Sequence, residues 1–155
     1  MRPLKDWLQE YALSHTNATN QAIHFVCVPL IYFTVFAFLY CVPLYVVGNG
    51  LTLTLAHVAF LFVAIYFLIL SPSIGIGMIL YTCLCLITCM SIQFITGGYL
   101  GWIALAIFIT AWAFQFWGHS VEGRKPSFFK DVQFLLIGPM WVLSKVYSKA
   151  GLNVN

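Results

Sequence analysis

The chain has 155 residues, of which 62% are hydrophobic and only 7% are charged, and its formal net charge at pH 7 is +3. A water-soluble domain carries roughly 25% charged residues, so this composition excludes a soluble fold and predicts one integral membrane domain, residues 1–155. We expect the small positive charge to mark the membrane side that faces the cytosol, and it does not indicate binding to nucleic acid.

Residues 1–14 predict a short amphipathic helix. Apolar residues recur at helical spacing, namely Leu4, Trp7, Leu8 and Tyr11. Charged and polar residues fill most of the other face, namely Arg2, Lys5, Asp6, Gln9 and Glu10. Such a helix lies in the membrane interface with its apolar side toward the lipid. The polar residues 14–20 that follow favour a turn or a helix cap over a continued helix.

A long uncharged stretch follows, because the sequence contains no Asp, Glu, Lys or Arg between Tyr11 and Val121. Turn signals near residues 48–50, 71–73 and 96–98 divide it into runs that are each close to the ~20 residues needed to cross the hydrocarbon. The predicted spans are residues 23–47, 51–70, 74–95 and 99–117, with Pro29 and Pro43 as kinks that a bundle can tolerate. We therefore expect an all-α, integral membrane four-helix bundle.

The C-terminal part is less regular. Residues 132–143 are largely apolar, but they contain Gln133 and are interrupted by Gly138-Pro139. They predict one or two interfacial or re-entrant half-helices, with a fifth span as the alternative. With four spans all 7 Lys and Arg lie on one side, whereas a fifth span would move Lys145 and Lys149 across. This bias places both termini in the cytosol, for a chain in a bacterial cytoplasmic membrane or in the endoplasmic reticulum.

The chain has 4 histidines, and three of them are expected near the cytosolic face. His15 precedes the first span, His24 lies about one turn into it, and His119 lies at the end of the fourth. Imidazole is the commonest metal ligand in proteins, and polar groups at membrane depth need partners. These three histidines therefore form a candidate metal site, and hydrogen-bonded packing residues are the alternative. His57 lies near the opposite face and is expected outside the cluster, unless the bundle is short.

Two polar segments accompany these histidines. Asn20 precedes His24 by four residues and so shares its helix face, from which it can orient a ligand by a hydrogen bond. Gln115, His119 and Glu122 follow one another at i, i+4 and i+7, which also places them on one helix face. Gln115 is either a site residue or a hydrogen-bond partner between helices.

These residues form two motifs: Tyr11-x3-His15-x4-Asn20-x3-His24, with Pro29 after it, and Gln115-Phe116-x-Gly118-His119-x2-Glu122-x3-Pro126, with the later Gly138-Pro139. From about Leu8 to Tyr147 the chain resembles the small membrane family typified by the yeast 2-hydroxy fatty acid dioxygenase. The resemblance implies an Fe(II)-dependent oxidoreductase of fatty acid α-oxidation. Its substrates would be O2 and a long-chain 2-hydroxy fatty acid taken from the lipid bilayer, and its product a fatty acid one carbon shorter.

The resemblance also implies that histidines are the functional residues. We carry this role onto His15, His24 and His119 as ligands of Fe(2+), whereas His57 matches no motif of the family. A 2-hydroxy acid can chelate iron through its carboxylate and hydroxyl, and three protein ligands leave positions for that chelate and for O2.

The charged residues after the fourth span are either part of a solvated loop or take part in this chemistry, and the second reading is our hypothesis. Glu122 is expected either as a fourth ligand or as a base that fixes His119 through its second ring nitrogen. Arg124 or Lys125 is expected to steer the substrate carboxylate.

Two other classes of protein stay open at this stage. In a haem-binding membrane protein, His24 and His119 would clasp the iron from two neighbouring helices. A non-enzymatic scaffold or small transporter would use the histidines only for packing, although uncharged spans offer little to an ion pathway.

Overall fold

The computed structural model describes residues 2–46, 52–123 and 134–152, which form a mostly helical protein with one small sheet. In these ranges the helices are α1 (Leu4–Leu13), α2 (Ala18–Tyr40), α3 (Leu55–Leu70), α4 (Pro72–Thr96), α5 (Leu100–Glu122) and α7 (Ile137–Lys149). The strands are β1 (Pro43–Val46) and β2 (Thr52–Thr54). Three of the helices, α2, α4 and α5, are long and apolar enough to cross a membrane. These helices identify a membrane protein.

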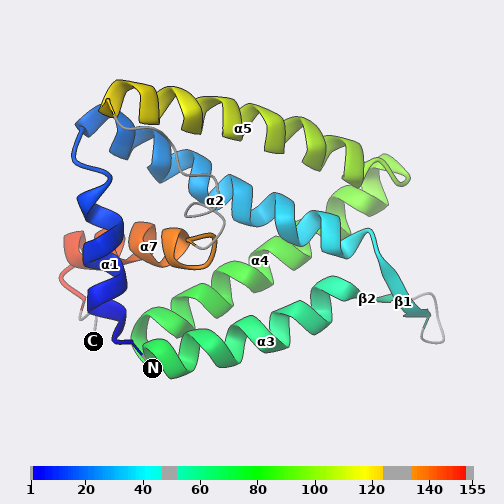
Figure 1. The fold of residues 1–155 in the computed structure, drawn as a ribbon. Coiled ribbons are helices and arrows are strands. Elements are labelled where there is room, and N and C mark those ends of the chain that lie inside the picture. Colours follow the sequence, from blue (N-terminus) through cyan, green and yellow to red (C-terminus); the bar gives the residue numbers. More distant parts are fainter. Residues whose placement is uncertain (1, 47–51, 124–133, 153–155) are drawn as a thin grey trace.

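The helices form two antiparallel pairs (Figure 1). The most extensive contact joins α2 to α5, and the next joins α3 to α4. Figure 1 shows that the pairs lie farther apart at the end that carries both termini, where α7 contacts α1, α2 and α4. The start of α2 therefore lies beside the end of α5, and α1 and α7 lie at the same end of the molecule.

The junction between α2 and α3 corrects the prediction of an all-α chain. The first span was expected to reach residue 47 and the second to start at 51, but β1 and β2 form an antiparallel two-stranded sheet there. Pro43 does not kink a helix; it opens β1 opposite Thr54, because a residue without an N–H cannot continue the helical ladder. The expected turn at residues 48–50 lies outside the described residues.

The hairpin shortens the second predicted span. Helix α3 has 16 residues, so its length is about 24 Å, which is less than the ~30 Å of a hydrocarbon core. The third and fourth predicted spans correspond to α4 and α5, and α5 continues past residue 117 to Glu122. Because α5 reaches Glu122, the side chains of Gln115, His119 and Glu122 all belong to one helix.

The C-terminal segment folds as one helix in the described residues. Gly138-Pro139 does not interrupt α7 but lies in its first turn, where backbone N–H groups have no intrahelical acceptor in any case. Helices α1 and α7 have 10 and 13 residues, which is short for a span. Their position in the membrane interface stays a prediction.

The core and the outer surface of the bundle are both apolar. The core includes the fully buried side chains of Tyr32, Phe67 and Met140. Large apolar side chains such as Phe94 and Trp102 remain exposed, at 88% and 71% of their surface. A water-soluble protein rarely exposes so much apolar surface, whereas a lipid environment accepts it without cost.

Candidate metal centre

Three histidines meet where the start of α2 lies beside the end of α5. His15 follows α1, His24 lies in the second turn of α2, and His119 lies in the last turn of α5. All three side chains are buried, with 3%, 2% and 6% of their surface exposed. The ring centroids of His15 and His24 are 4.2 Å apart, those of His24 and His119 4.9 Å, and those of His15 and His119 5.5 Å. One nitrogen from each ring lies within 4.8 Å of the others.

The Nδ1 atoms of His15 and His24 are both engaged by Tyr11. His15 Nδ1 donates to the Tyr11 carbonyl oxygen at 2.6 Å, and His24 Nδ1 is hydrogen-bonded to the Tyr11 hydroxyl at 3.2 Å. The Nε2 atoms of the same two rings are buried and have no hydrogen-bond partner among the described residues. A buried polar atom without a partner costs free energy, so two of them in one cluster indicate a missing ligand.

The protonation state of His15 also suits a metal ion. Burial lowers the pKa of His15 below its ordinary value, and repulsion by His119 acts in the same direction. The ring is then neutral at pH 7 and keeps the lone pair that a metal ligand needs. Two nitrogens on one ion lie at most about 4.2 Å apart, because each bond is ~2.1 Å long. Small side-chain rotations would therefore close the observed triad on one ion.

Glu122 joins the end of α5 to the start of α2. Its Oε1 atom accepts hydrogen bonds from the backbone N–H of Thr16 at 2.9 Å and from the Thr16 hydroxyl. Its Oε2 atom accepts from the backbone N–H of Asn17 and from Nδ2 of Asn20, both at 3.0 Å. A negative charge here is also favoured by the dipole of α2. Glu122 and the wholly buried Asn20 therefore hold together the two helices that carry His24 and His119.

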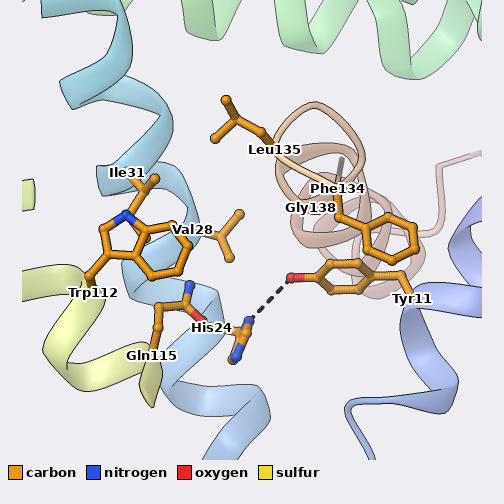
Figure 2. A pocket seen from close by; sticks show the side chains of 9 residues that line it. All are labelled: Tyr11, His24, Val28, Ile31, Trp112, Gln115, Phe134, Leu135 and Gly138. Atoms are coloured by element: carbon orange, nitrogen blue, oxygen red, sulfur yellow. Dashed lines mark hydrogen bonds between the residues drawn. The ribbon is translucent and has the colours of Figure 1, made fainter. Parts of the chain in front are cut away.

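A small cavity adjoins His24 between α2, α5 and the start of α7 (Figure 2). Figure 2 shows Gln115 on the α5 side of His24 and the Tyr11 hydroxyl on the other. The remaining wall is apolar, and it is formed by Val28, Ile31, Trp112, Phe134, Leu135 and Gly138. The cavity thus has a polar end formed by His24, Gln115 and Tyr11 and an apolar end away from them.

His57 lies in the first turn of α3, and α3 begins at the opposite end of the bundle (Figure 1). Its Nδ1 accepts from the backbone N–H of Thr54 at 3.1 Å and is hydrogen-bonded to the Thr54 hydroxyl at 2.9 Å. These contacts cap the N-terminus of α3. Arg124 and Lys125 lie outside the described residues.

Tyr11 is a residue of the site for which no contact with the histidines was predicted. Its aromatic ring had suggested only an interfacial position for residues 1–14. The available signal was its spacing, because Tyr11 and His15 are four residues apart and such residues meet on a helix.

The fold and the site are those of a helical membrane protein with a buried histidine cluster at one end of the bundle. The family model described as "2-hydroxy-palmitic acid dioxygenase Mpo1-like" matches residues 1–150, so the chain belongs to the Mpo1-like family. This match confirms the resemblance found in the sequence. Searches of the curated proteins and of the solved structures gave no significant match.

Proposed function

We propose that this protein is an Fe(II)-dependent dioxygenase that shortens a long-chain 2-hydroxy fatty acid by one carbon. The family match supports the reaction class. The observation that carries the proposal is the buried triad of His15, His24 and His119, with the two Nε2 atoms that lack a partner among the described residues. Three imidazole ligands suit Fe(II) and leave open positions for substrate and O2.

In the overall reaction the bond between C1 and C2 of the substrate breaks. C2 becomes the carboxyl carbon of the shorter acid, C1 leaves as CO2, and the remaining oxygen leaves as water, so O2 is the only oxidant required. The iron, when bound by the triad, would supply the activation of O2. The protein's own part is to hold both reactants beside one another and to exclude water.

The cavity beside His24 suits the polar head group of the substrate and the first carbons of its alkyl chain. The carboxylate and the 2-hydroxyl would lie at the polar end, near His24, Gln115 and the Tyr11 hydroxyl. The first carbons of the alkyl chain would contact the apolar wall, including Ile31 and Trp112. Close packing against this wall would fix the position of the chain, since an alkyl chain that arrives from lipid gains contacts there and little hydrophobic free energy.

We propose different roles for the two charged residues Glu122 and Arg124. Both oxygens of Glu122 accept hydrogen bonds from the start of α2, so we assign Glu122 the task of positioning the triad. Arg124 follows α5 in the sequence after Gly123, and we retain it as the cation that pairs with the substrate carboxylate. The haem alternative is disfavoured, because the edge-to-face contact of His24 and His119 at 4.9 Å leaves no space for a porphyrin between the rings.

Oxygen consumption tests the proposal. Detergent-purified protein is loaded anaerobically with Fe(II) and 2-hydroxypalmitate. O2 is then admitted, its uptake is followed with an electrode, and the products are identified by mass spectrometry. We expect uptake that requires Fe(II) and yields the saturated acid one carbon shorter. Palmitate, which lacks the hydroxyl, controls for specificity, and His57→Ala serves as a control beside His24→Ala. Uptake that persists in His24→Ala, or protein that binds iron but leaves 2-hydroxypalmitate unchanged, would reject the proposal.

A further inference from the structure

The geometry points to Tyr11 as the positioning residue that decides which nitrogen of His15 and of His24 faces the metal site. We infer that its carbonyl oxygen and its hydroxyl hold the two Nδ1 atoms, so that both Nε2 atoms point into the cluster. The inference rests on the proposed metal site, and it adds a residue that neither the histidine pattern nor the family match assigns.

Two different groups of one residue act on two histidines. The Tyr11 carbonyl oxygen can only accept, so the 2.6 Å contact places a proton on Nδ1 of His15 and the lone pair on Nε2. The Tyr11 hydroxyl is hydrogen-bonded to Nδ1 of His24 at 3.2 Å. With a metal on Nε2, that Nδ1 keeps its proton and donates to the hydroxyl. Such contacts to the second nitrogen fix the tautomer and the orientation of a ligand histidine.

Stacking of the Tyr11 ring on the His15 ring also fixes the orientation of His15. The rings of Tyr11 and His15 are stacked, with centroids 4.2 Å apart and an angle of 12° between their planes. The stack limits rotation of His15 about its side-chain bonds, since rotation would lose the contact surface. Tyr11 therefore sets both the protonation and the plane of His15.

Tyr11 can hold the histidines because its own position is well defined. Only 4% of its surface is exposed, and its ring packs against Trp141 at 5.2 Å and Phe134 at 5.4 Å. Gly138 in the first turn of α7 lies close to the hydroxyl, because a Cβ added there would be 3.3 Å from that oxygen and 3.0 Å from Val28. Helix α1 thus brings Tyr11 to the triad, and α7 supports it from behind.

The variant Tyr11→Phe tests the inference, because it keeps the ring, the stack and the carbonyl acceptor and removes only the hydroxyl. The metal-free protein is titrated with Co(II), a spectroscopic substitute for Fe(II), in competition with a coloured chelator. We expect a 10- to 100-fold weaker affinity, the usual cost of losing such a partner, together with an altered visible spectrum. This readout needs no turnover, so it does not depend on the substrate assignment.

Tyr32→Phe is the matched control. Tyr32 is also fully buried and its hydroxyl is hydrogen-bonded to Thr82 at 2.8 Å, but it belongs to the core and does not contact the triad. It should lose a similar amount of stability and keep the wild-type affinity and spectrum. An affinity loss as large as that of Tyr11→Phe would show that Tyr11 acts only through stability and would overturn the inference.

The remaining outcomes distinguish a failure of the role of Tyr11 from a failure of the proposed function. Wild-type affinity and spectrum in Tyr11→Phe, with no Co(II) binding by His24→Ala, would overturn the role of Tyr11 and leave the proposed function intact. Wild-type protein that binds no metal would overturn both. If Tyr11→Phe does not fold, Gly138→Ala replaces it, since its methyl group would press on the hydroxyl. Weaker Co(II) binding in that variant supports the inference, and unchanged binding contradicts it.

Discussion

The histidines of this protein have different tasks, and the hydrogen-bond partner of each Nδ1 atom determines which task a histidine has. The Nδ1 atoms of His15 and His24 contact Tyr11, which leaves their Nε2 atoms inside the cluster. Nδ1 of His57 contacts Thr54 and completes a helix cap. Each of these histidines lies 3 to 13 residues from its partner in the sequence, and the partner fixes the tautomer of the ring. The number of histidines alone therefore could not distinguish a metal ligand from a capping residue.

The substitution Glu122→Gln should destabilise the end of the bundle. An amide offers one acceptor oxygen, and its NH2 group would face donors on Thr16, Asn17 or Asn20. We expect a loss of about 1–3 kcal/mol in the free energy of unfolding, measured by denaturant titration in detergent, together with weaker metal binding.

Glu10→Gln is the control for Glu122→Gln. Glu10 pairs with Arg2 at the surface, where both side chains are about 40% exposed, and such pairs contribute about 0–1 kcal/mol. Equal stability losses in the two variants would contradict the positioning role of Glu122.

At the scale of elements, the site depends on how closely α5 approaches α2. Gly118 permits this approach, because a Cβ there would lie 2.5 Å from Oδ1 of Asn20 and 3.3 Å from Ile23. Gly118→Ala should therefore force the helices apart at the triad. We expect a loss of about 1–3 kcal/mol in stability and reduced metal affinity, measured by thermal unfolding and metal titration.

Gly101 provides the comparison on the same helix. A Cβ there would meet Cys41 at an ordinary distance of 3.5 Å, and alanine is the better helix former. Gly101→Ala should therefore fold and bind metal as the wild type does. Similar defects in both variants would mean that close packing at Gly118 is not what holds the triad.

The element boundaries show where sequence patterns succeed in an apolar chain. Ser71-Pro72 and Gly97-Gly98 mark turns through the backbone conformations of Pro and Gly, which are the same in water and in lipid. Helix α4 begins at Pro72 and ends just before Gly97, and α5 begins at Leu100. In β1 the signal was Pro43, which was interpreted as a kink inside the first span, and the other residues of β1 and β2 carry no turn signal. A run of apolar residues predicts a buried strand as well as a helix, so the hairpin was included in the first two spans.

At the scale of the whole molecule, the structure brings both ends of the described chain to one end of the bundle (Figure 1). The sheet and the turn between α4 and α5 lie at the other end. We therefore retain the prediction that the termini face the cytosol, because the described Lys and Arg residues, which are Arg2, Lys5, Lys145 and Lys149, all lie in or beside α1 and α7 at this end. A fluorescent protein fused to the C-terminus in bacteria should fluoresce, and alkaline phosphatase fused at Gly98 should be active. An active phosphatase at the C-terminus would contradict this topology.

The convergence of the three histidines was predictable because it needed only the spans and their directions. Successive spans alternate in direction, so the start of α2 and the end of α5 lie at the same face, and the structure adds that α2 and α5 pack against each other. The contacts of Glu122 with Thr16 and Asn17 join residues that are 106 and 105 positions apart, and no local pattern announces such pairs. The support from Tyr11 depends on where α7 places Gly138, which also required the folded chain.

We propose that His15, His24 and His119 together hold one metal ion. Calorimetric titration of metal-free protein with Fe(II) under anaerobic conditions measures this binding. We predict saturation at about one ion per chain for the wild type and for His57→Ala, and no binding by His24→Ala or His119→Ala, because two remaining imidazoles hold Fe(II) only weakly. Folded wild-type protein that takes up no Fe(II), or a His24→Ala variant that still saturates, would contradict the claim.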